Sequence, residues 1–209
     1  MRDRTDDFGL TALAAGVFVP SWWSRHASAT AAVAEAVATV SADIAEQYLH
    51  DALALSGSPL TNDQLEAVWV SVTGGNHRPA AEGLGGRAWF RRLAELMTPL
   101  VERAGREAGE ADAVDPQDPV VGQVVDIVGR LSFRSNFWRD PVDEGFLRTA
   151  LADLARSGRP ELALRLFISV AVNHHARLDD DLEAAVWRTG RRFGYGDHLL
   201  ARLEHLTGS

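Results

Sequence analysis

The sequence predicts an all-α fold, a compact domain of about eight to nine helices within a chain of 209 residues. Three observations support this prediction. Apolar side chains recur at intervals of three and four residues, which is the spacing along one face of a helix. Capping residues and glycine or proline stops bracket most of these segments. No two adjacent segments alternate apolar and polar residues with period two, and no Asn-Gly or Asp-Gly dipeptide marks a hairpin turn.

The first apolar segment, 8–20, is expected to form a buried helix, because its 13 residues are too few to span a bilayer. A secretory signal is the alternative, with Ala-Ser-Ala at 27–29 as its cleavage site. However, the residues before the segment carry three acids and two arginines, where a signal needs net positive charge. We therefore expect a cytoplasmic protein, which also fits the absence of cysteine. The sequence leaves open whether 8–20 is cleaved.

Two long helices are expected next. Ser28 suits the N-cap of a helix over 29–55, whose apolar residues share one face. Ser41 could cap a second helix, so a break in this segment is an alternative. The following helix begins at a capping box over 61–64 (Thr-x-x-Gln), and the glycines at 74–75 end it.

A loop over 76–86 precedes a helix with an aromatic and leucine stripe. Pro99 in this helix indicates either a kink or a new start capped by Thr98. Residues 105–118 are acidic and contain Gly and Pro, which is typical of a linker. We expect residues 1–209 to form one helical domain, with lobes 1–104 and 119–209 joined by 105–118 as the alternative.

Five further helix starts follow the linker. Asp118-Pro119 begins a valine-rich helix, for which a strand is the alternative. Asp140-Pro141 opens the next helix. Pro160 begins a segment that is apolar on almost every side, which is typical of a central buried helix. Asp179 and Asp197 are expected to cap the last two helices.

The composition excludes several classes of enzyme. All 21 basic residues are arginine, and the chain has neither lysine nor cysteine. Schiff-base enzymes, P-loop proteins and kinases need a lysine. Thiol nucleophiles, disulfides and cysteine-ligated metal sites are excluded as well. A net charge of −8 makes binding to nucleic acid or to an anionic membrane unexpected, because phosphate repels an acidic surface.

Four residues form the sharpest candidate metal site: His26, His50, Asp51 and Asp126. Imidazole and carboxylate ligands can hold one divalent metal ion, which acidifies a water molecule and polarises a phosphate. The spacing within SRHASATAAVAEAV and EQYLHDALAL resembles the HD-domain metal-dependent phosphohydrolases, which are all-helical. The resemblance implies that His26, His50 and Asp51 ligate the metal and that Asp126 completes its shell. It implies a phosphorylated small molecule or a nucleotide as substrate.

This metal site has a geometric requirement. One continuous helix over 29–55 would separate His26 from His50 by about 36 Å, at about 1.5 Å per residue. A break near 41–43 is therefore needed for a shared metal ion. The alternative is that His50 lies on a solvated face of the helix with Asp43 and Glu46.

Two further groups of residues are candidates for a site. The histidines at 174–175 and the acids at 179–181 either hold a metal ion or mark the ends of two helices, where such charges are favoured. A basic-aromatic patch could contact a nucleotide or an acidic partner, or form a solvated helix end. It consists of Arg188, Arg191, Arg192, Phe193 and Tyr195.

Aromatic pairs in expected loops suggest a binding surface, namely Trp22, Trp23, Phe137 and Trp138. The alternative is that they fill the core from the loops. The preferred function is a soluble helical protein that acts through contacts with a protein or a small molecule, with a homodimer compatible. The alternative is a metal-dependent phosphohydrolase of HD-domain type, with a divalent metal ion as its cofactor. The sequence assigns no catalytic residue.

Overall fold

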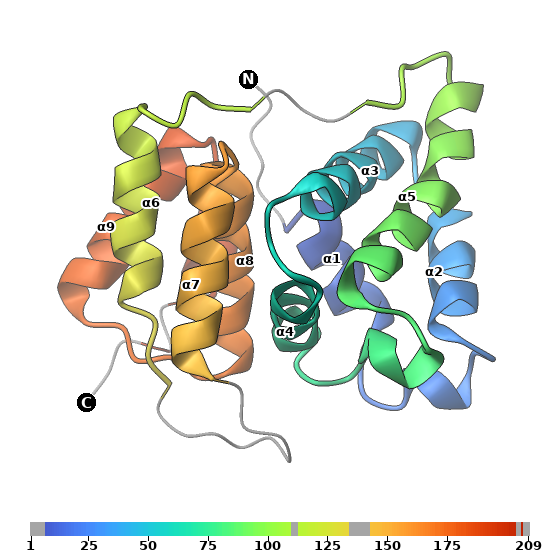
Figure 1. Ribbon diagram of the computed structural model, residues 1–209, viewed down its shortest axis with the longest axis horizontal. Helices are drawn as coiled ribbons and strands as arrows, with labels where there is room; N and C mark the ends of the chain where they lie inside the picture. The colour runs from blue at the N-terminus through green and yellow to red at the C-terminus, as the bar shows by residue number, and fades with distance from the viewer. Residues whose placement is uncertain (1–6, 110–112, 134–142, 204–205, 207–209) are drawn as a thin grey trace. The chain divides into compact units, whose positions relative to one another are not determined.

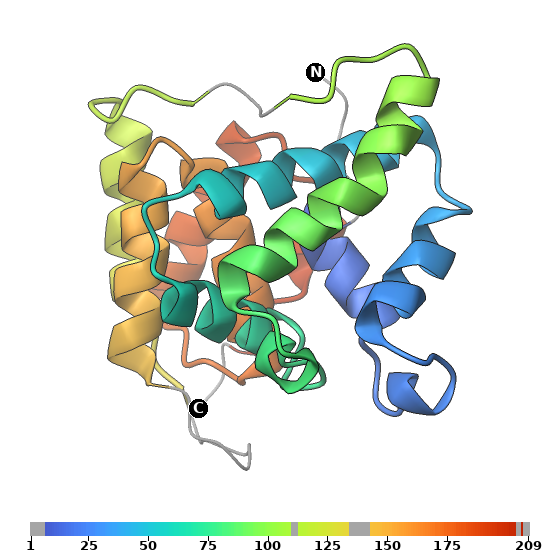
Figure 2. The same cartoon turned by 45° about the vertical axis from the view of Figure 1, so that its right-hand side comes forward.

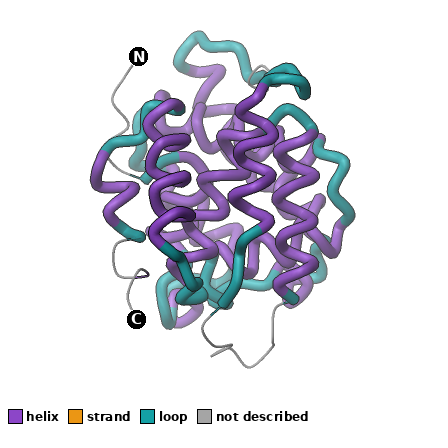
Figure 3. The backbone as a smooth tube through the Cα atoms, turned by 90° about the vertical axis from the view of Figure 1, so that its left-hand side faces the viewer, coloured by secondary structure: helices purple, strands orange, loops and turns teal. Residues whose placement is uncertain are grey.

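The all-helical prediction is confirmed by a computed structural model, which describes residues 7–109, 113–133, 143–203 and 206. Within these residues there are ten α-helices, nine of them seven residues or longer, and no strand. Figure 3 shows the described chain as helices and connecting loops. One isolated β-bridge joins Phe133 to Ala176.

The chain packs as two compact units, one formed by residues 8–112 and the other by 113–209 with 1–7. The change from one unit to the other falls within the acidic segment 105–118. The first unit holds five α-helices and two short 3₁₀ turns. These are α1 (Gly9–Val17), η1 (Trp22–Ser24), α2 (Ala29–Val37), α3 (Ala42–Gly57), α4 (Asn62–Val72), η2 (Pro79–Glu82) and α5 (Gly86–Arg103).

The segment 29–55 forms two helices, so the prediction of one long helix is wrong and the break at Ser41 is correct. Each helix has a serine N-cap. The Ser28 hydroxyl accepts a hydrogen bond from the amide of Ala31 at 3.1 Å, and the Ser41 hydroxyl accepts one from Ile44 at 3.4 Å. These bonds satisfy backbone donors that a helix start leaves unpaired. Helix α3 then packs on α5, which crosses it obliquely (Figure 2).

Two further local predictions concern α4 and α5. The capping box of α4 is confirmed, with reciprocal hydrogen bonds between Thr61 and Gln64. A new helix start at Thr98 is wrong, because α5 runs through Pro99 without interruption. The Thr98 hydroxyl donates to the carbonyl of Ala94 at 2.9 Å, one turn earlier, instead of capping a helix.

Aromatic rings around His77 fill the core of the first unit. The His77 side chain is buried, and its ring stacks on Phe18 with centroids 4.6 Å apart. Its Nδ1 accepts a hydrogen bond of 2.8 Å from the indole N–H of Trp69. Burial lowers the pKa of His77 from 6.5 to about 4, because the charged ring would lose its hydration. Trp22 and Trp89 also contact the His77 ring.

The second unit holds the other five α-helices. Helix α8 is its buried centre, as predicted, and contacts α6, α7 and α9; Figure 1 shows α6, α7 and α8 side by side. The helices are α6 (Pro119–Gly129), α7 (Glu144–Arg156), α8 (Pro160–Asn173), α9 (Asp180–Arg192) and α10 (Asp197–Ala201). Arg165 of α8 is buried and pairs with Glu161, its Nε lying 3.1 Å from Oε1.

The predicted starts of these helices have mixed outcomes. Asp118 and Asp179 are the N-caps of α6 and α9, and the strand alternative for α6 is wrong. Asp140-Pro141 lies outside the described residues, where nothing tests it. Asp197 is not the cap of α10: Gly196 holds that position, and the Asp197 carboxylate accepts a hydrogen bond from Arg191 instead.

Among the described residues, no helix combines the length and the apolar character that crossing a bilayer requires.

Candidate ligand pocket

The predicted metal ligands of the first unit take up separate positions. His26 lies beside Glu35, with Nδ1 3.4 Å from the carboxylate. His50 is half-buried on α3. Asp51 is buried and accepts a hydrogen bond of 2.7 Å from the amide of Leu10, at the start of α1. Its carboxylate therefore satisfies a free donor of a helix N-terminus, a role that a His-Asp pair in sequence does not reveal.

The fourth predicted ligand, Asp126, lies on α6 in the other unit. Across the described part of the chain, no three His, Asp or Glu side chains lie close enough together to hold a metal ion. The structure thus does not gather His26, His50 and Asp51 into one site. The phosphohydrolase stays a prediction from the sequence.

The acids and histidines of the second candidate cluster have structural roles. Asp179 caps α9, and Asp180 and Asp181 lie in its first turn, where negative charge is favoured by the helix dipole. His174 follows α8 and stacks on Phe133, with ring centroids 4.7 Å apart. These observations match the helix-end interpretation.

The predicted aromatic surface is divided. Trp22 is buried, and its indole N–H donates to the carbonyl of Asn76 at 2.7 Å, so it fills the core from a loop. Trp22 is therefore not a surface residue, in contrast to the prediction. Trp23 is 58% exposed and meets Trp22 edge to face. Phe137 and Trp138 lie outside the described residues.

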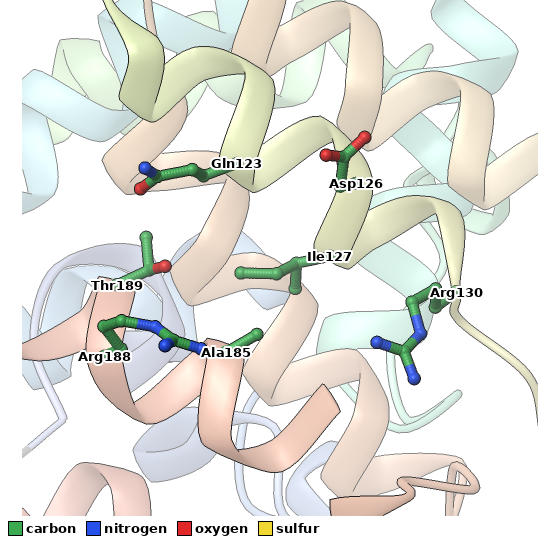
Figure 4. A pocket seen from close by; sticks show the side chains of 7 residues that line it. All are labelled: Gln123, Asp126, Ile127, Arg130, Ala185, Arg188 and Thr189. Carbon is green, nitrogen blue, oxygen red and sulfur yellow. The ribbon is translucent and has the colours of Figure 1, made fainter. Parts of the chain in front are cut away.

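A pocket of about 440 Å³ lies between α6 and α9 in the second unit (Figure 4). Its volume is within the range of small-molecule sites. Ile127 and Thr189 are buried and form its base, whereas the longer polar side chains are exposed around its rim. The lining residues are Gln123, Asp126, Ile127, Arg130, Ala185, Arg188 and Thr189.

Helical periodicity explains why these residues face one another. On α6 and its C-cap, positions 123, 127 and 130 are four and three residues apart, and on α9 positions 188 and 189 follow position 185 by three and four residues. Each set therefore forms one stripe along its helix. Ala185 and Thr189 are small, so the facing stripes leave space between the two helices.

Two guanidinium groups lie on this rim, one from Arg130 at the C-terminal end of α6 and one from Arg188 on α9. Arg130 donates from Nη2 to both carboxylate oxygens of Asp179, at 2.6 Å each. The pKa of Asp179 is lowered, first by the backbone hydrogen bond from Leu182 and then by the one from Arg130. No hydrogen bond or ion pair is found for the Arg188 side chain among the described residues, and its guanidinium lies beside Ala185 in Figure 4.

A second pocket of about 440 Å³ lies between α3 and α5 in the first unit. Its two charged residues are Arg91 and Glu95, and Glu95 is held by Arg92 at 2.9 Å. Only one cation thus lines this pocket, with a carboxylate near it. The α6/α9 pocket is lined by two arginines and one carboxylate, so it carries more positive charge and is the stronger candidate for binding an anion.

Two residues of this pocket are also singled out by the sequence, for other reasons. Asp126 was predicted as a metal ligand and Arg188 as part of a basic-aromatic patch, while Gln123, Arg130 and Thr189 were not singled out. The signal in the sequence that could have indicated the pocket is the helical spacing of Gln123 and Arg130 from Ile127. No protein-family model, curated protein or solved structure gives a significant match to this chain.

Proposed function

We propose that this protein binds a small organic molecule with one carboxylate group in the α6/α9 pocket. The observation that carries the proposal is the pair of arginines, Arg130 and Arg188, on the rim above a partly apolar base. Guanidinium groups match the planar geometry of a carboxylate and can donate two parallel hydrogen bonds to it.

The rest of the pocket suits a ligand with an apolar body. Ile127 and Ala185 offer apolar contacts, and Thr189 and Gln123 offer polar ones. Asp126 also lines the pocket, and its negative charge disfavours a highly charged anion such as a phosphate dianion. A monocarboxylate with a small ring or short chain fits both the volume and this balance of charges.

A titration followed by NMR of the labelled full-length protein tests the proposal. Benzoate is the probe, and benzyl alcohol and benzylammonium are neutral and cationic compounds of similar size. We expect benzoate to shift the resonances of α6 and α9 and to bind more tightly than the other two. Equal binding of the three compounds, or shifts confined to other helices, contradicts the proposal.

The charge on Arg188 is tested with a matched pair of variants. Arg188→Gln is expected to weaken benzoate binding about two- to fivefold, because Arg188 is exposed and an exposed charge pair contributes only that range. Arg191→Gln is the control, because Arg191 lies on the same helix but pairs with Asp197 and does not line the pocket. The same Kd for Arg188→Gln and Arg191→Gln would refute a role for Arg188.

A further inference from the structure

One carboxylate links the two walls of the pocket. Asp179 is the N-cap of α9, since its Oδ1 accepts a hydrogen bond of 2.8 Å from the amide of Leu182. The same carboxylate accepts the two 2.6 Å hydrogen bonds from Nη2 of Arg130, the C-cap residue of α6. Arg130, in turn, lines the pocket. Asp179 is therefore bound to one of the two arginines that line the pocket.

This ion pair is exposed to solvent. The Arg130 side chain is 44% exposed and that of Asp179 is 65% exposed. Ion pairs of this kind contribute little to stability, because water and salt screen them. Another carboxylate can therefore compete with Asp179 for the hydrogen bonds that Arg130 donates. While Asp179 remains, its charge offsets that of Arg130 and repels a second anion beside it.

We propose that Asp179 is a built-in competitor of the ligand, a carboxylate that occupies Arg130 and sets how weakly the pocket binds an anion. This inference rests on the proposed function of the pocket. Asp179 caps its own helix, so it remains next to Arg130 whether or not a ligand is present. The pocket is accordingly expected to bind a carboxylate ligand more weakly than it would without the charge of Asp179 beside Arg130.

A positioning role for Asp179 predicts the opposite result. If Asp179 only held the guanidinium in place for the ligand, removing its charge would weaken binding. As a competitor, it must act in the other direction. The sign of the change in affinity therefore separates the two roles.

The test compares benzoate affinity in the wild-type protein and in two capping variants. Asp179→Asn and Asp179→Ser both keep an oxygen that caps α9, and both lack the charge. We expect each to bind benzoate about two- to fivefold more tightly, the range expected for an exposed ion pair. The control is Asp143→Asn, because Asp143 caps α7 in the same way and no ion pair joins it to an arginine among the described residues.

Each outcome has a separate meaning. The inference is supported if both Asp179 variants bind benzoate more tightly than wild type and Asp143→Asn binds it like wild type. This holds even where wild-type binding is too weak to measure and only the Asp179 variants bind detectably. If the wild-type protein binds benzoate and the Asp179 variants bind it equally well or more weakly, the inference is overturned and the proposed function stays in place. No binding of benzoate by any of the proteins overturns both.

Discussion

Protonation of His77 is predicted to destabilise the first unit. The rings around His77 belong to Phe18, Trp22, Trp69 and Trp89. None of these side chains carries a negative charge that could pair with a protonated His77. Nδ1 accepts the indole N–H of Trp69, so the neutral ring carries its proton on Nε2. A second proton would sit on Nδ1 and face another donor, which breaks the hydrogen bond.

The size of the effect follows from the pKa. Burial lowers the pKa of His77 from 6.5 to about 4. At about 1.4 kcal/mol per pKa unit, this difference corresponds to about 3 kcal/mol of stability. The unfolded chain binds the proton more tightly, so the contribution is complete above pH 6.5 and is lost as the pH falls towards 4. Below pH 4 it no longer changes.

The assay is urea unfolding of the full chain between pH 4 and 7.5, with the indole N–H signal of Trp69 as a local probe. His77→Gln keeps an acceptor but does not titrate in this range. The stability difference between wild type and His77→Gln isolates His77 from the acids, and we expect wild type to lose about 3 kcal/mol more than the variant. His198→Gln, at an exposed histidine, is expected to match wild type. Parallel pH profiles for wild type and His77→Gln would refute the reasoning.

Three further predictions concern stability, each measured by urea unfolding. Asp51→Ala is expected to destabilise the first unit by about 1–3 kcal/mol, because it leaves a buried amide of α1 unpaired; an unchanged midpoint contradicts this role. Gly86→Ala should destabilise, since its Cβ would lie 2.5 Å from a backbone oxygen of α4, whereas Gly122→Ala, with nothing within 4 Å, should stabilise by about 1 kcal/mol. Equal effects of the two would contradict the packing. Glu161→Ala should destabilise, because it removes a carboxylate that is hydrogen-bonded to buried Arg165 and to Tyr195, and Arg165→Met should destabilise less; the reverse order would exclude this explanation.

Local signals in the sequence predicted most of the helices. Ser28, Thr61 and Asp179 cap helices where they were expected to, because an N-cap depends on residues within three positions along the chain. The break before α3 was harder to predict, since serine also occurs inside helices and the apolar spacing of Val37, Val40 and Ile44 continues across Ser41. The choice depends on how α2 and α3 each pack against their neighbours in the first unit, which a linear pattern does not contain.

The candidate site was less predictable for a physical reason. Asp51 next to His50 resembled a metal pair, but its carboxylate binds the amide of Leu10, 41 residues away in the chain. The pocket likewise depends on how α6 and α9 are placed side by side. Its polar residues look like ordinary surface side chains in the sequence, and only the packing of α6 beside α9 brings Arg130 and Arg188 to the same pocket.

The central claim is that the α6/α9 pocket binds a small carboxylate, and a crystal structure with 4-bromobenzoate tests it most directly. The anomalous signal of bromine locates the ligand without reference to the protein. We predict a bromine peak over Ile127 and Ala185, with the carboxylate within hydrogen-bonding distance of Arg188 or Arg130. A bromine peak only elsewhere on the protein, or an empty pocket at saturating ligand, would contradict the account.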